Sequence, residues 1–503
     1  PILLKSKSPL SKHIRDTKGL LVYHKIGAGK SCAAITIAEK WIKYAADNGL
    51  RSKPMIVTAA SLIPGFRNEI RGPCGVEHHE YISEEDAAAL LQSKPSSPEY
   101  KRIIKDSNEI ISHRYKILSY NKFLEDYKSG SLGSVPSILI VDEVQNINNI
   151  SGSYFGAISG YIDKHAEMPV VLLSGTPLFD GPRELIGLMR LLRIESGDLS
   201  QGANYTKQNL PSPADVERLF TGKVSFYPGA PDFTFPRAEI TLLFCEMSAF
   251  QSRWYRSQVA SERKKGMLVR HEIPNDFYIK SRQRANIVYP NGLTGAAGLN
   301  ALTPSMISGP NQALKTYSAK FNKLLKFLSQ GELSFIYTSF AEYGGIAALT
   351  KCLDARGYKD FAKFGSGRNR YAIWSGEETD GQKEIVRATF NSRQNDDGSQ
   401  IRIIVGSPAI KEGVSLMRVR QVHILEPYWN HSRLAQIYGR ALRYCSHKNV
   451  PKSQRAVDIY IYVAICYDLH GKKSIEELAD PDKSIDAYML SIADAKKEES
   501  DPY

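Results

Sequence analysis

Cysteine is scarce in this sequence, and its pattern argues against a metal site. The 503 residues contain six cysteines, without a C-x-x-C pair and without histidines at zinc spacing. The six are Cys32, Cys74, Cys245, Cys352, Cys445 and Cys466. Cysteines scattered in this way predict a reducing compartment and no structural metal.

Long hydrophobic runs are also missing. No apolar segment approaches the roughly 20 residues that a membrane-spanning helix needs, so we expect no membrane association. The chain starts at Pro1 rather than at Met. We therefore expect native residues before it, and the lack of a targeting signal carries no information.

The charge balance lacks an acidic excess. Lys and Arg number 66 against 53 Asp and Glu, which gives a formal net charge of +13. A basic excess suggests a polyanionic partner such as nucleic acid, although a basic protein without that role is an open alternative. The length is sufficient for two to four domains.

Six short segments in a fixed order carry the functional signal. They are HKIGAGKS at 24–31, VDEVQN at 141–146, SGTP at 174–177, FIYTS at 335–339, EGVSL at 412–416 and QIYGRALR at 436–443. Each is weak alone. Together they predict a two-lobed ATPase that converts ATP hydrolysis into movement along nucleic acid.

The first segment lies between an apolar run and a helical pattern. Residues 19–23 have the size of a buried parallel strand, and apolar residues recur at helical spacing over 31–48. Strand, glycine turn and helix form the context that a phosphate loop requires. His24 stands where the general pattern has glycine, which the loop tolerates if residue 24 avoids positive φ.

Five residues of this loop are candidates for holding ATP. The backbone N–H groups of Gly27, Ala28 and Gly29 would wrap the phosphates, and the helix N-terminus adds positive potential. Lys30 would reach the β- and γ-phosphates, and Ser31 would ligate Mg²⁺. The predicted cofactors are therefore ATP and Mg²⁺.

An acidic pair follows a second apolar run at 137–141. A carboxylate at the end of a parallel strand faces the edge where α/β folds bind ligands. Asp142 would hold Mg²⁺, and Glu143 would activate the attacking water. A surface acidic pair that ends a strand is the alternative, and Lys30 and Ser31 upstream disfavour it.

Three polar residues are candidates for coupling. Ser174 and Thr176 follow the apolar run 170–173, where their hydroxyls can hydrogen-bond toward the carboxylate loop. Gln145 belongs to the carboxylate segment itself. Taken alone, the Ser/Thr pair is better explained by an ordinary turn before a helix.

The second half repeats the strand and helix pattern. We predict strands over 333–338, 401–407 and 422–425, a helix over 341–355, and a last helix from Ser484 that serves packing. Two more junctions of strand and loop, at 53–60 and 117–121, are candidates for contact with a nucleic-acid backbone.

A helix predicted over 432–444 would place Gln436, Gly439, Arg440 and Arg443 on one face. A face with two arginines and a helix-destabilising glycine suggests a close partner. An arginine there would stabilise the γ-phosphate in the transition state when the lobes close.

Gly413 and Ser415 lie in the loop after the 401–407 strand. We expect Gly413 beside the nucleotide and Ser415 to couple the nucleotide to bound nucleic acid. As isolated residues they would indicate only a glycine turn.

The predicted fold class is α/β, with two RecA-like parallel-sheet lobes and a mainly helical or irregular insertion. The expected divisions are an ATP-binding lobe at 1–195, an insertion at 196–312, a second lobe at 313–480 and a tail at 481–503. Within the insertion, 247–270 is helical and basic, and Lys280, Arg282 and Arg284 extend this basic run. A solvated helix face explains it better than an arm that contacts phosphates.

The ordered segments resemble superfamily 2 helicases and translocases, over most of residues 15–497. Further stretches resemble a branch from large cytoplasmic DNA viruses, which includes the poxvirus early transcription factor small subunit and nucleoside triphosphate phosphohydrolase I. These stretches are LVYH at 21–24, GKVSFY at 222–227, YGG at 343–345 and NDDGSQ at 395–400.

The resemblance implies DNA-dependent ATP hydrolysis in viral transcription, in the cytoplasmic viral factory or packaged in the virion. It also implies a transcription-factor subunit or an RNA polymerase as partner. An RNA helicase and a DNA-binding scaffold with little motor activity are the alternatives. Lys30, Asp142, Glu143, Arg440 and Arg443 disfavour the scaffold, since an inactive motor tends to lose at least one of them.

Overall fold

The computed structural model describes most of the chain. The described residues are 18–25, 28–49, 52–72, 74–75, 80–93, 97–194, 209–229, 234–263, 277–309, 313–328, 331–411, 414–469, 471 and 474–502. The chain divides into two compact units. Unit 1 comprises residues 1–230 with 498–503, and unit 2 comprises residues 231–497.

Unit 1 is built on a six-stranded parallel sheet with the order β3-β2-β4-β5-β1-β6. Its strands are β1 (Gly19–His24), β2 (Met55–Thr58), β3 (Lys116–Ser119), β4 (Leu139–Val141), β5 (Val170–Ser174) and β6 (Val224–Tyr227). Because all strands run the same way, every strand ends at one edge of the sheet.

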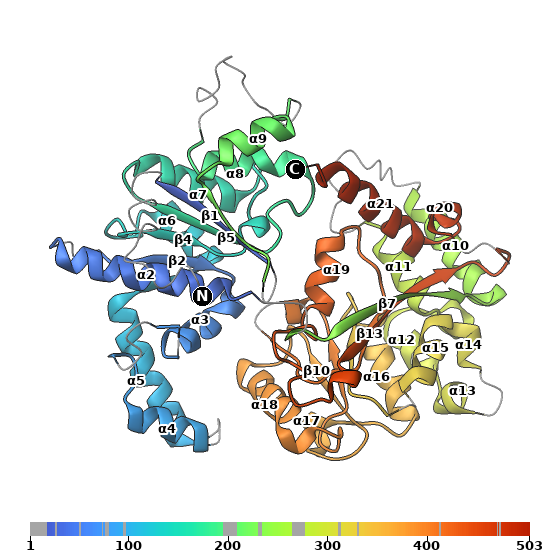
Figure 1. Ribbon diagram of the computed structural model, residues 1–503. Helices are drawn as coiled ribbons and strands as arrows, with labels where there is room; N and C mark the ends of the chain where they lie inside the picture. Colours follow the sequence, from blue (N-terminus) through green and yellow to red (C-terminus); the bar gives the residue numbers. More distant parts are fainter. Residues whose placement is uncertain are drawn as a thin grey trace. The chain divides into compact units, whose positions relative to one another are not determined.

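Helices cover both faces of this sheet (Figure 1). They are α2 (Lys30–Asp47), α3 (Ile63–Ile70), α4 (Glu84–Gln92), α5 (Pro98–Arg114), α6 (Tyr120–Ser129), α7 (Ser153–Lys164), α8 (Leu185–Leu191) and α9 (Pro213–Phe220). Leu20 and Val22 pack toward α2 and α3, whereas Leu21 packs toward α7 and α8. Alternate burial on two faces explains why the strand is continuously apolar.

Unit 2 is built on a seven-stranded parallel sheet with the order β7-β13-β12-β8-β11-β10-β9. Its strands are β7 (Arg237–Glu246), β8 (Ser334–Tyr337), β9 (Lys359–Asp360), β10 (Arg370–Trp374), β11 (Ile403–Gly406), β12 (Gln421–Ile424) and β13 (Ala456–Ile465).

The helices of unit 2 fall into two groups along the chain. Before β8 lie α10 (Ala249–Arg263), α11 (Ile279–Asn286), α12 (Gly295–Ala301), α13 (Pro304–Ser308), α14 (Leu314–Tyr317) and α15 (Ala319–Leu328). After it lie α16 (Ile346–Ala355), α17 (Phe361–Phe364), α18 (Asp380–Asn391), α19 (His431–Tyr438), α20 (Ile475–Leu478) and α21 (Ile485–Ser500). α15 and α16 pack on one face of the sheet, and α18 and α19 pack on the other.

The predicted α/β class with two parallel-sheet lobes is confirmed. One difference concerns the middle of the chain, because β6 and β7 lie there and each is the edge strand of a sheet. Most residues of β7 are exposed, so it lacks the buried apolar pattern by which the other strands are recognised. A second difference is that α16 begins at Ile346 rather than at 341.

Candidate functional site

The predicted phosphate loop connects β1 to α2. Gly29 has φ 82°, a conformation that favours glycine, and the helix starts at the next residue, Lys30. His24 is the last residue of β1 and has no positive φ, so the missing first glycine leaves the loop geometry possible. Ala28 is described, whereas Ile26 and Gly27 lie outside the described residues.

The acidic pair lies beside this loop. The side-chain nitrogen of Lys30 is 3.3 Å from Oε1 of Glu143, and Asp142 is only 3% exposed. Burial, and then the neighbouring Glu143, raises the pKa of Asp142 to about 7, while Lys30 acts in the opposite direction. The structure therefore brings two carboxylates and one cation together in a site that is largely shielded from solvent.

Two further residues hold the acidic pair, and they come from the two strand-to-loop junctions, 53–60 and 117–121, that were predicted to contact nucleic acid. Thr58 is the last residue of β2, and its hydroxyl group donates a hydrogen bond to Oδ2 of Asp142 at 2.9 Å. Tyr120 donates its hydroxyl hydrogen bond to the backbone oxygen of Asp142. Glu143 has φ 49° and ψ 52°, a strained conformation for a residue with a Cβ. Backbone strain of this kind is concentrated at functional sites.

The coupling candidates form a chain of hydrogen bonds from the acidic pair. Gln145 donates to Oε2 of Glu143 at 2.5 Å, and Ser174 donates to Oε1 of Gln145 at 2.6 Å. The backbone N–H of Thr176 then donates to the Ser174 hydroxyl at 3.0 Å. The structure thus links the end of β5 to Glu143 through two buried side chains.

The oxygen ligands available fit Mg²⁺. No group of three or more His, Cys, Asp or Glu side chains that could hold a metal occurs among the described residues. Mg²⁺ in ATPases needs fewer protein ligands, because phosphates and waters complete its shell. The carboxylate of Asp142 and the hydroxyl of Ser31 are ligands of the right kind.

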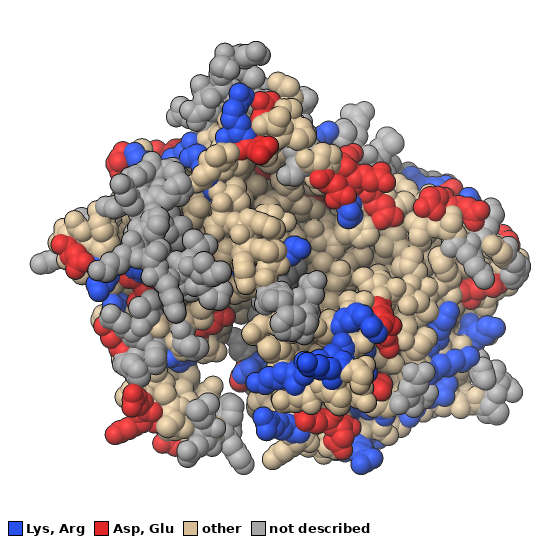
Figure 2. Space-filling view, viewed as in Figure 1, with Lys and Arg blue, Asp and Glu red and all other residues tan. Residues whose placement is uncertain are grey.

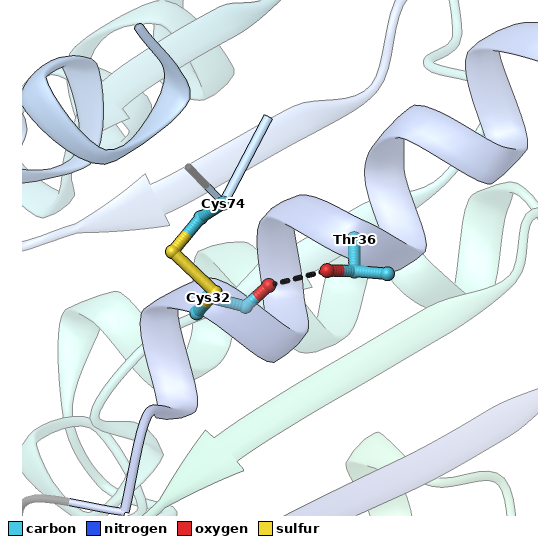
Figure 3. The surroundings of a disulfide bond; sticks show 3 residues. All are labelled: Cys32, Thr36 and Cys74. Atoms are coloured by element: carbon cyan, nitrogen blue, oxygen red, sulfur yellow. Dashed lines mark hydrogen bonds between the residues drawn. A yellow bond between two sulfur atoms is a disulfide. The ribbon is translucent and has the colours of Figure 1, made fainter. Parts of the chain in front are cut away.

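The sequence predicted that all six cysteines are free thiols in a reducing compartment, and the structure differs from this at two of them. Cys32, in the first turn of α2, forms a disulfide with Cys74, and Thr36 donates to the backbone oxygen of Cys32 at 2.9 Å (Figure 3). The two cysteines are 42 residues apart in sequence. Their spacing gives no hint of the pair, because only the packing of α3 against α2 brings Cys74 close.

Loss of this disulfide should weaken unit 1. The bond closes a loop of 42 residues, so the Cys74→Ser variant should lose about 2–4 kcal/mol of unfolding free energy. Calorimetry of the full chain would measure the shift, with Cys445→Ser, a free and partly exposed cysteine, as the control. Equal transitions of Cys74→Ser and the wild type without reductant would contradict the bond.

In unit 2 the predicted helix over 432–444 is wrong in its second half. α19 ends at Tyr438. Arg440 follows it in a turn and Arg443 lies outside regular structure, so they do not share a helical face with Gln436. The carbonyl oxygen of Arg440 accepts from the N–H of Leu416 at 2.9 Å instead of continuing the helix. A glycine at 439 lowers the cost of this early ending.

The same contact places two predicted segments together. Leu416 follows Ser415, whose backbone oxygen accepts from the side-chain amide of Asn391 on α18 at 2.8 Å. Ser415 and Arg440 are therefore neighbours in unit 2, while Gly413 lies outside the described residues.

The basic segment of the insertion is largely committed to contacts within unit 2. On α10, Arg256 pairs with Asp468 at 2.7 Å, and Arg263 pairs with Asp480 at 2.6 Å. Lys264, Lys265 and Arg270 lie outside the described residues. The described arginines thus favour a surface helix over an arm that contacts phosphates.

Another part of unit 2 is more basic on its surface. Figure 2 shows Lys and Arg side chains gathered over the region where Figure 1 draws β10, α17 and α18. The exposed or partly exposed cations of these elements and their connections are Lys363, Arg368, Arg370, Lys383, Arg387 and Arg393. In the part of the chain that the structure describes, no helix has both the length and the apolar character needed to cross a bilayer.

Two protein families match separate parts of the chain. The SNF2-related domain matches residues 10–210, and the helicase conserved C-terminal domain matches residues 319–445. The first match contains the phosphate loop and the acidic pair. The second contains Ser415, Arg440 and Arg443, and the segment 211–318 lies between the two.

Three viral proteins are similar over most of the chain. A protein of Acanthamoeba polyphaga mimivirus, named as an ATP-dependent RNA helicase R563, is 39% identical, over 92% of this chain and 81% of its own length. A protein of Invertebrate iridescent virus 3, named as helicase 087L, is 27% identical over 95% of this chain. The termination factor NPH-I homolog of African swine fever virus is 24% identical, over 94% of this chain and 72% of its own length. The chain spans about half (49%) of the iridescent virus protein.

Proposed function

We propose a function from the premise that this chain belongs to the superfamily 2 helicases of large DNA viruses, with an SNF2-related domain followed by a helicase C-terminal domain. Its core is thus that of a nucleic-acid-dependent ATPase of the SNF2 class. We propose that it is a DNA-dependent motor that acts in viral transcription. The observation that carries the ATPase assignment is the contact of Lys30 with Glu143 beside buried Asp142.

We assign roles to the residues of unit 1 as follows. Gly27, Ala28 and Gly29 wrap the phosphates of ATP through their N–H groups. Lys30 binds the β- and γ-phosphates in place of its present contact with Glu143.

The remaining residues of the acidic site act on the metal and on water. Ser31 and Asp142 hold Mg²⁺, which neutralises phosphate charge when it is bound. Glu143 accepts the proton of the attacking water. The hydrogen-bonded path through Gln145 and Ser174 to Thr176 carries the state of Glu143 to the end of β5.

In unit 2 we assign Arg440 and Arg443 to charge stabilisation in the nucleic-acid-bound, catalytically active state, with Gln436 and Gly413 near the nucleotide. Ser415 would couple this group to nucleic acid, because its neighbour Leu416 bonds the Arg440 backbone directly. We propose that residues 196–312 are an insertion between one lobe at 1–195 and a second lobe at 313–480. Residues 481–503 would form a tail.

An RNA helicase is the second candidate, and the name of the mimivirus relative favours it. The name of the African swine fever virus relative, a termination factor, favours a role in transcription. We accordingly propose an RNA polymerase or a transcription-factor subunit as protein partner, in the viral factory or in the virion.

The test is ATP hydrolysis with duplex DNA, single-stranded DNA and RNA at equal nucleotide concentrations. The proposal expects duplex DNA to stimulate most. Stimulation by RNA alone would select the second candidate, and lack of stimulation by every polymer would overturn the motor assignment for the isolated chain.

Binding to nucleic acid should be salt-sensitive and largely independent of sequence, because it relies on contacts with the backbone phosphates. If about three phosphates are contacted, the affinity should fall roughly 40-fold between 50 and 200 mM salt. Fluorescence anisotropy with two unrelated duplexes would measure this fall.

The surface cations supply a matched pair of variants for the same titration. Arg368→Ser removes an exposed cation from the basic region of unit 2 and should reduce the salt slope by about one. Arg256→Ser removes a cation already paired with Asp468 and should leave the slope unchanged. A flat salt dependence of the wild type, or strong preference for one sequence, would contradict backbone binding.

A further inference from the structure

The segment between the two family matches contacts loops of the seven-stranded sheet through α11. Residues 211–318 are covered by neither matched domain, and α11 lies within them. Three polar side chains of α11 are almost completely buried, namely Ser281 at 0% exposed, Arg282 at 3% and Asn286 at 0%, and the last two contact the loops of the sheet. Burying polar groups is costly unless partners satisfy them, so their contacts indicate what they do.

Arg282 lies between two aromatic rings on different loops. Its guanidinium is 5.3 Å from the ring centre of Phe340, which follows β8, and 5.6 Å from that of Trp429, which follows β12. Its Nη2 also lies 3.5 Å from the hydroxyl of Ser339. A guanidinium between two rings attracts both of them, so Arg282 bridges the two loops.

Glu426 holds the same two loops from the buried side. It follows β12, is 1% exposed, and accepts hydrogen bonds from the Thr338 hydroxyl at 2.8 Å and the Ser339 N–H at 2.6 Å. Asn286 of α11 donates to it as well and also donates to the backbone oxygen of Gly344 at 2.9 Å. The loop after β8 is therefore fixed at both of its ends.

A second buried cation completes this arrangement. Lys320 of α15 is fully buried and lies 2.7 Å from Oδ2 of Asp486 on α21. It also donates to the backbone oxygen of Leu425 at 2.6 Å and to Oδ1 of Asn286 at 3.1 Å. The two cations, Arg282 and Lys320, thus balance two buried carboxylates, and α21 contributes a charge as well as the predicted packing.

The loop after β8 has little freedom to move independently. A Cβ on Gly344 would lie 2.5 Å from Cγ of Gln283 on α11, and one on Gly345 would lie 1.9 Å from the backbone oxygen of Phe340. Such close approaches require glycine. The loops that follow β8 and β12 leave the same edge of a parallel sheet, the edge at which α/β folds bind their ligands.

We propose that Arg282 is a positioning residue for nucleic-acid-stimulated ATP hydrolysis, which holds the loops after β8 and β12 as one surface against the nucleic-acid backbone. This inference rests on the proposed motor function. It gives the insertion a role through α11 rather than through the basic face of α10. Arg282 itself need not touch nucleic acid, since it acts through Phe340, Ser339 and Trp429.

The experiment compares the nucleic-acid concentration that gives half-maximal ATPase stimulation in full-length variants. Arg282→Met should raise that concentration about tenfold, while ATP affinity without nucleic acid stays that of the wild type. Arg282→Lys should restore part of the loss, because it keeps the charge without the planar group. Arg284→Met is the matched control, because Arg284 lies on the same helix but stacks on Trp254 of α10.

A further variant separates positioning from folding. A merely structural role of Arg282 predicts that stimulation weakens only where the melting temperature falls, whereas the positioning role predicts weak stimulation in protein that stays folded. Phe340→Leu removes a partly exposed ring and should weaken stimulation in a protein of unchanged melting temperature.

Wild-type half-maximal concentrations in both Arg282→Met and Phe340→Leu would overturn the inference. That result would not affect the proposed function. Failure of every polymer to stimulate the wild-type protein would overturn the proposed function instead, so the two failures are distinguishable.

Discussion

ATP hydrolysis by the Glu143→Gln variant should fall by about a thousandfold while ATP binding is retained. Glutamine preserves the size of the side chain and can still accept the hydrogen bond from Gln145, but it cannot take a proton from water. It also releases Lys30 from its 3.3 Å ion pair, so Lys30 becomes freer to bind phosphate. ATP should therefore remain trapped in the site.

Single-turnover hydrolysis and equilibrium binding of ATP would measure the two effects separately. Glu39→Gln is a matched control, because Glu39 is another buried glutamate on α2 and accepts hydrogen bonds from Tyr81 and Tyr115. Its hydrolysis rate should match that of the wild type. Loss of ATP affinity in Glu143→Gln would instead make Glu143 a binding residue and not the base.

The sequence predicts those parts of the site in which the reaction requires a particular residue type and in which the residue directly follows a strand. The end of the strand then determines where the residue lies. Lys30 follows β1 through a glycine loop, and Asp142 follows β4, so a parallel sheet necessarily brings both to one edge. The contact from Ser174 to Gln145 follows from the same geometry. These relations need only the order of the strands and not the details of packing.

The parts that could not be predicted depend on contacts between distant segments. Thr58 and Tyr120 hold Asp142 because β2 lies beside β4 and β3 lies beside β2. Their strand-to-loop junctions were predicted, but as contacts for nucleic acid, and nothing local assigns either residue to Asp142. The Cys32–Cys74 bond depends on the packing of α3 against α2. Propensity alone does not reveal such pairings, because tertiary contacts decide them.

Two errors have the same origin in unit 2. The helical pattern continues past Tyr438, but the backbone of Arg440 pairs with Leu416, and this contact ends the helix early. Arg282 belongs to a run that looks like a solvated basic helix face, yet it is buried between two rings. A cation with aromatic partners far away in sequence is indistinguishable from a surface cation until the fold is known.

The Lys30→Ala variant should lose ATP hydrolysis almost completely, by more than about a thousandfold, and unlike Glu143→Gln it should also lose ATP affinity. Lys30 is the cation placed to bind the β- and γ-phosphates, so its removal takes away direct binding. It also lowers the pKa of Asp142, so without Lys30 that pKa rises further above its value of about 7. Asp142 would then be protonated at neutral pH more often and would hold Mg²⁺ less well.

Two losses in one variant give a test with two readouts. Equilibrium binding of ATP should weaken without Mg²⁺ through the lost phosphate contact, and added Mg²⁺ should recover less affinity than in the wild type. Lys43→Ala, an exposed lysine on the same helix, should behave as wild type in both. Near-normal turnover of folded Lys30→Ala protein would remove the basis for a phosphate loop at residues 24–31. The ATPase assignment depends on that loop and would then be wrong. The two parallel sheets would remain, as the fold of a protein with another function.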